Sequence, residues 1–249
     1  MSNINLPWLD PKDPYHPFPS PEDALDSPEG LVAAGGDLSP ARLLRAYCEG
    51  IFPWYEEGQP ILWWSPNPRG ILYPKKFIAH KSLLRTLRKK NWKVTYDQAF
   101  QSVMTACSEP RSYARGTWIT KDMINAYCHL HQLNHAHSFE VWDESKNLIG
   151  GIYGISMGSI FFGESMFSRE TDASKVALLH LSAYMDHWDY QLLDTQLPSE
   201  HLEFLGGEHI PRKEYLAHLR VLTYEQPAEN AWQKGVPIDI MEWLTSKNK

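Results

Sequence analysis

Residues 158–196 read GSIFFGESMFSRETDASKVALLHLSAYMDHWDYQLLDTQ, and the order of elements within this stretch decides the fold. The apolar run at residues 159–162 predicts a strand, and the polar residues that follow, beginning with Gly163-Glu164-Ser165, predict a turn. Apolar side chains at helical spacing predict a helix at residues 173–187. A second apolar run then predicts a strand that ends in Asp194-Thr195-Gln196.

The end of this second strand carries the first candidate site. Because side chains alternate along a strand, Asp194 and Gln196 are expected to point the same way, roughly 7 Å apart. A carboxylate and an amide would then lie together beside the expected turn at Gly163-Glu164-Ser165. The alternative is that both side chains only satisfy hydrogen bonds of the backbone at the end of a strand.

Composition predicts a globular protein that lies in the cytoplasm. The 249 residues are 43% hydrophobic and 22% charged, enough for one large domain or for a domain with a smaller companion. No apolar run approaches the roughly 18 residues of a membrane span, and the first residues lack the pattern of a signal peptide. Three widely separated cysteines indicate thiols in a reducing compartment, and the net charge of −6 argues against a generally basic nucleic-acid binder.

Residues 1–70 are rich in Pro, Gly and Trp and predict a small N-terminal domain, followed by a second domain at residues 71–249. One helix is expected in the first part, with Asp37 or Ser39 as its cap, Pro40 in its first turn and Gly50 as its stop. The aromatic residues after it form either a small core or a stacking surface; they are Phe52, Trp54, Trp63 and Trp64.

Residues 79–92 predict an amphipathic helix with a basic face. Leucines fall on one side of this helix, and the other side carries Lys81, Arg85, Arg88 and Lys89. Such a face is usually only solvated. Because it bears no acidic residue in an acidic chain, the hypothesis that it faces phosphate groups is favoured.

Four histidines invite a metal-site hypothesis, and they are His129, His131, His135 and His137. Asn134 is expected to end a helix between them, and no acidic or thiolate partner stands at a fixed spacing. The sequence therefore predicts surface and helix-end histidines and no metal site.

From residue 138 onward the order is three antiparallel strands, a helix and a further strand, within an α+β fold. This is the core order of the Gcn5-related N-acetyltransferase (GNAT) fold, which predicts a GNAT-like C-terminal domain with a mixed sheet. Acetyltransferases of that fold hold the coenzyme A pyrophosphate in a glycine-containing turn before the helix. This chain has SRETDASK there, with no glycine between Gly163 and Gly206, so another acyl donor is expected.

Ten separated strings follow the order found in leucyl/phenylalanyl-tRNA–protein transferases, and they span about residues 18–216. They are FPSPEDAL, GLVAAGGDLSPARLLRAYCEGIFPW, ILWWSPNPRG, GTWIT, HAHSFEVW, GGIYG, FFGESMFSR, ASK, LLDTQ and IPRKEYL. The chain therefore closely resembles this family.

The resemblance implies an aminoacyltransferase that moves Leu, Phe and, less readily, Met from aminoacyl-tRNA to an N-terminal Arg or Lys of a protein. The product would be marked for degradation by the N-end rule. The implied partners are Leu-tRNA, Phe-tRNA and such proteins or peptides, and the implied enzyme is a cytoplasmic monomer without metal, cofactor or membrane contact. Two rival hypotheses are an acetyl-CoA-dependent acetyltransferase of the same fold and a non-catalytic tRNA-binding protein.

The resemblance also implies roles for particular residues. Gln196 would accept a hydrogen bond from the attacking amine while Asp194 polarises the Gln196 amide. Glu164 would hold the acceptor's cationic group or its α-ammonium. The alternative is that Glu164 only accepts hydrogen bonds from the backbone of its own turn. Trp54 and Trp118 would hold the terminal adenosine of the tRNA, and the basic face would contact its backbone. The pocket for the amino-acid side chain would consist of Ile152, Met166, Leu178, Leu181 and Leu193.

Two matters stay open at this stage. The family's His-x-x-Ser-Leu-Gly-Ala is expected where this chain has His201-Leu202-Glu203-Phe204-Leu205-Gly206-Gly207, so the preference among Leu, Phe and Met is undecided. The group that finally accepts the proton of the amine is also open: it is Asp194, water or the leaving ribose hydroxyl.

Overall fold

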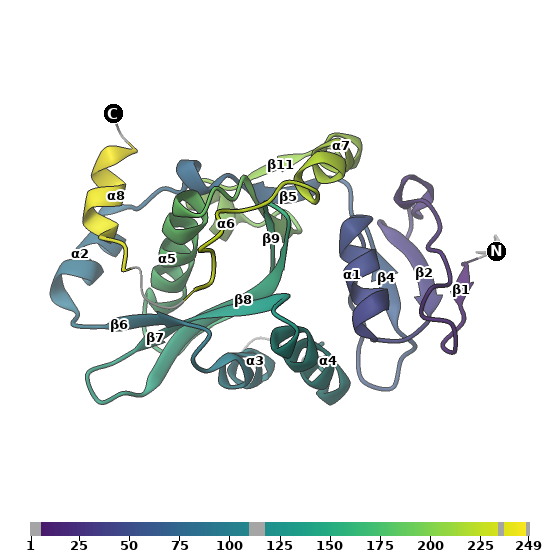
Figure 1. Ribbon diagram of the computed structural model, residues 1–249, viewed down its shortest axis with the longest axis horizontal. Coiled ribbons are helices and arrows are strands. Elements are labelled where there is room, and N and C mark those ends of the chain that lie inside the picture. The colour runs from purple at the N-terminus through teal and green to yellow at the C-terminus, as the bar shows by residue number, and fades with distance from the viewer. Residues whose placement is uncertain (1–5, 110–117, 234–236, 248–249) are drawn as a thin grey trace.

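The computed structural model describes residues 6–109, 118–233 and 237–247. It shows an α+β protein with a small four-stranded sheet and a larger, mixed seven-stranded sheet (Figure 1). The predicted α+β class is confirmed. Gly116 and Thr117 of the GTWIT string lie outside the described residues.

The small sheet is built from the N-terminal part of the chain, with strand order β1-β2-β4-β3. Its elements are β1 (Trp8–Leu9), β2 (Leu31–Gly35), β3 (Phe52–Pro53), β4 (Leu62–Trp64), the 3₁₀ helix η1 (Pro21–Asp23) and helix α1 (Pro40–Cys48). Ser39 caps α1 by accepting a hydrogen bond from the Arg42 N–H, and Pro40 opens it, as predicted. Among the aromatic residues Phe52 and Trp63 are buried core, whereas Trp54 is 43% exposed.

The large sheet has the order β11-β5-β10-β9-β8-β7-β6. Only the β9–β10 pair is parallel among these neighbours, which makes the sheet mixed. Its strands are β5 (Arg69–Leu72), β6 (Lys93–Tyr96), β7 (Ala136–Trp142), β8 (Leu148–Met157), β9 (Ile160–Ser168), β10 (Leu192–Gln196) and β11 (Glu208–Ile210). The predicted boundary at residue 70 therefore falls inside a strand of this sheet.

Helices cover both faces of the large sheet, so that two hydrophobic cores form (Figure 1). Helix α5 packs on one face with α2 and α8 near it, and α3 and α4 pack on the other face. The helices are α2 (Lys81–Lys89), α3 (Phe100–Ser108), α4 (Lys121–Gln132), α5 (Ala173–His187), α6 (Glu200–Phe204), α7 (Arg212–Leu222) and α8 (Ile240–Ser246), with a 3₁₀ helix η2 (Pro74–Lys76). No helix in the described part of the chain is long and apolar enough to cross a membrane.

The expectation of a turn at residues 163–165 is wrong, because β9 runs on to Ser168. Its pairing with β8 shifts there: Tyr153 lies opposite Ser165 and Gly154 opposite Gly163, which leaves Glu164 as the extra residue of a β-bulge. The neighbouring strand β10 has its own irregularity against β5, between Asp194 and Gln196. The parallel pairing of β9 with β10 ends at Asp194 and Phe162, just before both irregularities.

One of these two cores is shared by the small sheet and the large sheet. Residues of α1, α4, β9 and α7 belong to the same buried cluster, among them Tyr47, Tyr127, Phe162 and Tyr215. The chain turns from α1 at Gly50 (φ 75°), where an added Cβ would lie 2.7 Å from Leu216 of α7. Only glycine allows this backbone conformation and this close approach together.

Candidate active site

The two irregular strand positions bring Glu164 and Gln196 together. The Gln196 side-chain Nε2 donates a hydrogen bond to Glu164 Oε1 over 2.7 Å. Gln196 itself has a left-handed backbone with φ 64°, so the simple alternation expected for residues 194–196 is wrong. The bulges, rather than a regular strand, direct these side chains toward each other.

Glu164 is a buried carboxyl group surrounded by tyrosine hydroxyls. Tyr47 donates to its Oε1 over 2.7 Å and Tyr127 to its Oε2 over 3.2 Å, and the two hydroxyls lie 2.5 Å apart. Burial raises the pKa of Glu164 to about 7, although the tyrosines and Gln196 oppose the rise by donating hydrogen bonds. A carboxyl group with such a pKa can both accept and release a proton near neutral pH.

The contact with Glu164 fixes the orientation of the Gln196 amide. When Glu164 is ionised it only accepts hydrogen bonds, so the Gln196 nitrogen faces it and the amide oxygen is left over. This oxygen has no hydrogen-bond partner among the described residues. It is therefore free to accept a hydrogen bond from a substrate.

Asp194 is fully buried, and its carboxylate is held by four donors. Arg69 Nε donates to Oδ1 over 2.9 Å and Arg69 Nη2 to Oδ2 over 2.6 Å. The Tyr215 hydroxyl donates to Oδ2 over 2.7 Å, and the Gln196 backbone N–H donates to Oδ1 over 2.8 Å. The expected contact of Asp194 with the Gln196 side-chain amide is thus replaced by a contact with its backbone. The enclosed carboxylate has no free position for a substrate proton and instead holds Gln196 in place.

Arg69 connects Asp194 to the small sheet. Its Nη1 donates to the Gly50 carbonyl over 3.0 Å, and its guanidinium lies 5.0 Å from the Phe52 ring and 4.4 Å from the Tyr215 ring. The sequence predicted no part in the site for Arg69, Tyr215, Tyr47 or Tyr127. Arg69 and Tyr215 stand within the quoted strings ILWWSPNPRG and IPRKEYL, and Tyr47 within RAYCEG, but no spacing rule distinguishes them there.

A cavity of about 780 Å³ opens beside Glu164. Four of the five predicted pocket residues line it, namely Ile152, Met166, Leu178 and Leu193. The fifth, Leu181, is fully buried in the core and is not part of the cavity wall. Trp118 and Glu164 also line the cavity, and Ser174, Ser199 and His201 add polar groups.

The two predicted adenosine-binding tryptophans lie in different settings. Trp118 is half-buried in the cavity wall, whereas Trp54 is exposed and is not part of that wall. The Trp54 and Trp64 rings pack edge-to-face with their centroids 5.7 Å apart. The structure therefore places Trp118 at the cavity and leaves Trp54 on the surface.

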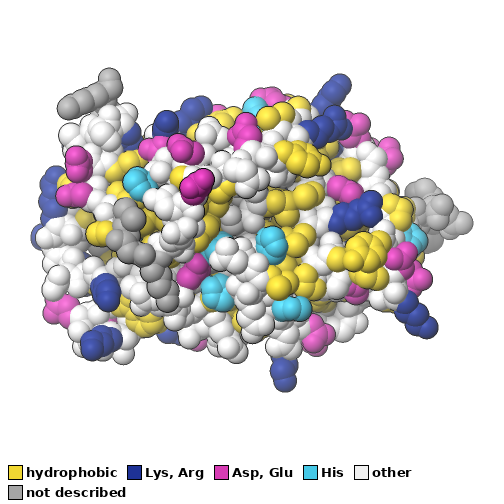
Figure 2. All heavy atoms as spheres, in the orientation of Figure 1, with side chains coloured by type: hydrophobic (Ala, Val, Ile, Leu, Met, Phe, Trp, Pro, Cys, Tyr) yellow, Lys and Arg dark blue, Asp and Glu magenta, His cyan; other side chains and the backbone are white. Residues whose placement is uncertain are grey.

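The basic face of α2 is formed as predicted. Its four cationic side chains are exposed, while Leu83 is buried. In Figure 2, Lys and Arg side chains gather along the edge of the molecule over α2. One acid lies near: Asp172 accepts a hydrogen bond from Thr86 of α2 over 2.8 Å.

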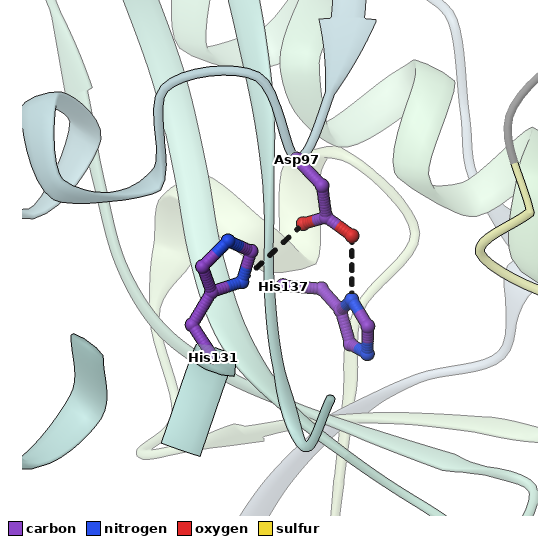
Figure 3. Close-up of side chains that lie close together, drawn as sticks. All are labelled: Asp97, His131 and His137. Atoms are coloured by element: carbon purple, nitrogen blue, oxygen red, sulfur yellow. Dashed lines mark hydrogen bonds and ion pairs between the residues drawn. The ribbon is translucent and has the colours of Figure 1, made fainter. Parts of the chain in front are cut away.

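Asp97, His131 and His137 lie close enough to suggest a metal site (Figure 3). The two Nδ1 atoms, however, are hydrogen-bonded to acceptors: His131 to the Ala136 carbonyl and His137 to Asp97, both over 2.7 Å. Since a carbonyl and a carboxylate only accept, each Nδ1 carries a proton, and the lone pair of each ring lies on Nε2. His137 Nε2 is buried and has no hydrogen-bond partner among the described residues. The interpretation as surface histidines is wrong for His137, which is 1% exposed and stacks on Trp232.

Removing Arg69 should leave the Asp194 carboxylate buried without a counter-charge. We predict that Arg69→Met lowers the free energy of unfolding by about 3–5 kcal/mol, measured by urea denaturation. The matched control is Arg45→Met, which breaks the more exposed Arg45–Glu49 pair and should cost less than about 1 kcal/mol. Equal losses in the two variants would contradict the structural role of Arg69.

The family described as leucyl/phenylalanyl-tRNA protein transferase matches residues 71–220, and the N-terminal domain of that family matches residues 36–67. The protein of Methylococcus capsulatus named leucyl/phenylalanyl-tRNA–protein transferase is 48% identical, over 95% of this chain and 100% of its own. A protein of the same name from Cellvibrio japonicus is 50% identical, over 90% of this chain and 94% of its own.

Among solved structures, that of L-PGS from Bacillus licheniformis is similar over 66% of this chain and 54% of that one, with a TM-score of 0.39 and 10% identity. This likeness is too low to add to the argument. The sequence relatives are about half identical and extend over nearly the whole chain. The chain therefore belongs to the leucyl/phenylalanyl-tRNA protein transferase family.

Proposed function

We propose that the protein transfers leucine or phenylalanine, and less readily methionine, from aminoacyl-tRNA to the N-terminal Arg or Lys of acceptor proteins. The transfer would mark these proteins for N-end-rule degradation, and the enzyme would act in the cytoplasm as a monomer without a cofactor. The observation that carries the proposal is the pairing of Glu164 with Gln196 beside a cavity whose wall is partly apolar. This arrangement offers a proton acceptor, an orienting amide and a slot for an uncharged side chain.

The reaction is an attack of an amine on an ester. Glu164 takes one proton from the acceptor's α-ammonium, whose ordinary pKa of about 7.7–8.0 is close to the Glu164 pKa of about 7. The Gln196 amide oxygen then orients the free amine by accepting its hydrogen bond. The new C–N bond forms, the ester C–O bond breaks, and the leaving ribose oxygen takes the second proton from the nitrogen.

The donor side chain occupies the apolar part of the cavity. Ile152, Leu178 and Leu193 are buried, and Met166 is half-buried. The unbranched side chain of Met166 makes this part of the wall adaptable. A charged donor side chain would lose its hydration there without a partner, so transfer of charged residues is disfavoured. Leu181 supports this wall from the core and does not contact the donor.

The tRNA lies across two surfaces. The terminal adenosine stacks on Trp118 at the cavity, and Trp54 offers the second aromatic face. The basic face of α2 binds the tRNA backbone through charge and therefore does not read sequence. This division suits an enzyme that selects its donor by the amino acid.

The larger sheet is proposed to be a remodelled GNAT-like domain. Strands β8 and β9, helix α5 and the parallel strand β10 follow the order expected for that fold. The segment before α5 lies in the wall of the cavity through Ser168 and Arg169, where it contributes to an amino-acid pocket.

Transfer itself is tested by incubating the protein with labelled Leu-tRNA and a peptide that begins with Arg. Label should enter the peptide, and RNase treatment or acetylation of the peptide N-terminus should abolish the transfer. Parallel reactions with acetyl-CoA test the acetyltransferase hypothesis. Labelling from acetyl-CoA alone, or tRNA binding without any transfer, would overturn the proposed function.

The proton-accepting role of Glu164 predicts a particular pH dependence. The carboxylate form is required, so kcat/KM should rise with pH through about 7 and then level off. Because the Tyr47 hydroxyl stabilises the carboxylate, Tyr47→Phe should move this midpoint upward by roughly 0.5–1 pH unit. A midpoint that stays unchanged in Tyr47→Phe would show that the rise belongs to the substrate amine.

The contact of the basic face with tRNA predicts a change in salt dependence. Arg85→Glu with Arg88→Glu should raise the KM for aminoacyl-tRNA and reduce the slope of log KM against log salt by about 0.7–0.9 per lost phosphate contact. The control is Lys12→Glu with Arg220→Glu, which makes the same change of net charge at exposed positions outside α2. Equal slopes in both double variants would reject α2 as the tRNA surface.

A further inference from the structure

A second cavity, of about 360 Å³, lies between α2, β6, α5 and α8. Helix α5 separates it from the main cavity: Ser174 and Leu178 face the main cavity, whereas Val176 and His180 face the second one. In Figure 1 the helices α2 and α8 lie together at the end of the molecule that is far from the small sheet. This volume falls within the range of small-ligand pockets.

His180 presents a fixed hydrogen-bond acceptor to the second cavity, in addition to the carboxylate of Asp239 at its wall. His180 Nδ1 donates to the Val176 carbonyl over 2.8 Å, which leaves the lone pair on Nε2. Nε2 has no partner among the described residues. Burial lowers the pKa of His180 to about 4, so the ring stays neutral and remains an acceptor at neutral pH. A ligand here must therefore bring an N–H or O–H donor, which a fatty-acid carboxylate lacks.

The rest of the second cavity presents an aromatic ring and charges of both signs: Asp239 also lines the wall, and Lys90 is ion-paired with Glu170 over 3.1 Å. Trp92 is half-buried in the wall, and Lys90 Nζ lies 5.4 Å from the centre of its ring. Arg88 is exposed at the wall and forms no ion pair within the described part of the chain. Arg88 is therefore the unpaired cation of this wall, and an aromatic surface beside it fits a planar ligand that carries a negative charge.

We propose that this second cavity binds a nucleoside monophosphate unit, with the base beside Trp92, an amino group of the base donating to His180 Nε2 and the phosphate near Arg88. The base supplies the donor and the planar surface, and the phosphate supplies the negative charge. The unit is either a free nucleotide or a nucleotide of bound RNA. The RNA source rests on the proposed function, because Arg88 also belongs to the basic face; binding of a free nucleotide does not.

The test is photolabelling of the full-length protein with 8-azidoadenosine 5′-monophosphate, followed by peptide mapping. Label is expected on peptides that contain residues 86–94 or 239–241, separate from any label near Trp118. His180→Phe should reduce this label roughly tenfold, the loss expected for one buried hydrogen bond. His187→Phe, the same change at an exposed position of α5, should leave it unchanged.

A competition experiment on the unaltered protein does not depend on the folding of any variant. AMP should displace the label roughly tenfold more effectively than purine riboside 5′-monophosphate, which lacks the amino group. Displacement by excess deacylated tRNA would identify the source as RNA, and displacement by AMP alone would identify a free nucleotide. Label confined to peptides of the main cavity, or equal competition by the two nucleotides, would overturn the inference. Leucine transfer is assayed separately, so its failure is distinguishable from failure of this second site.

Discussion

The buried ion pair between Arg69 and Asp194 is the constraint on which the rest of the site depends. Two charges removed from water are costly unless each is fully hydrogen-bonded. Here the carboxylate accepts from Arg69, Tyr215 and the Gln196 backbone, and the guanidinium also donates to Gly50. The network joins β5, β10, α7 and the end of α1. It thereby stabilises the left-handed backbone of Gln196, which a regular strand would not adopt.

The two buried carboxyl groups of the site have opposite environments and therefore opposite properties. Asp194 is paired with the Arg69 guanidinium over 2.6 Å and accepts hydrogen bonds from four donors. Glu164 has only neutral donors around it, and burial therefore raises its pKa to about 7. In the proposed function this difference divides the work of the site: Asp194 positions Gln196, and Glu164 exchanges protons.

The sequence predicted those features that depend on regular periodicity. Helix α5 and the strand order around it follow from apolar spacing, and Ser39, one of two candidate caps, was recognisable before Pro40. The bulges at Glu164 and between Asp194 and Gln196 were not predictable, because each depends on the neighbouring strand. The same holds for the Arg69–Asp194 pair, whose residues are 125 positions apart, and for Leu181, which helical spacing could not assign to core or cavity.

The N-terminal part of the chain contributes directly to the site that is formed on the large sheet. Tyr47 of α1 donates to Glu164, and the Gly50 carbonyl after α1 accepts from Arg69. The first contact lowers the pKa of Glu164, and the second helps to hold the arginine that pairs with Asp194. Both carboxyl groups therefore depend on α1, although neither belongs to the small sheet. A division of the chain near residue 70 describes the order of its elements, but the active site is one unit built across that division.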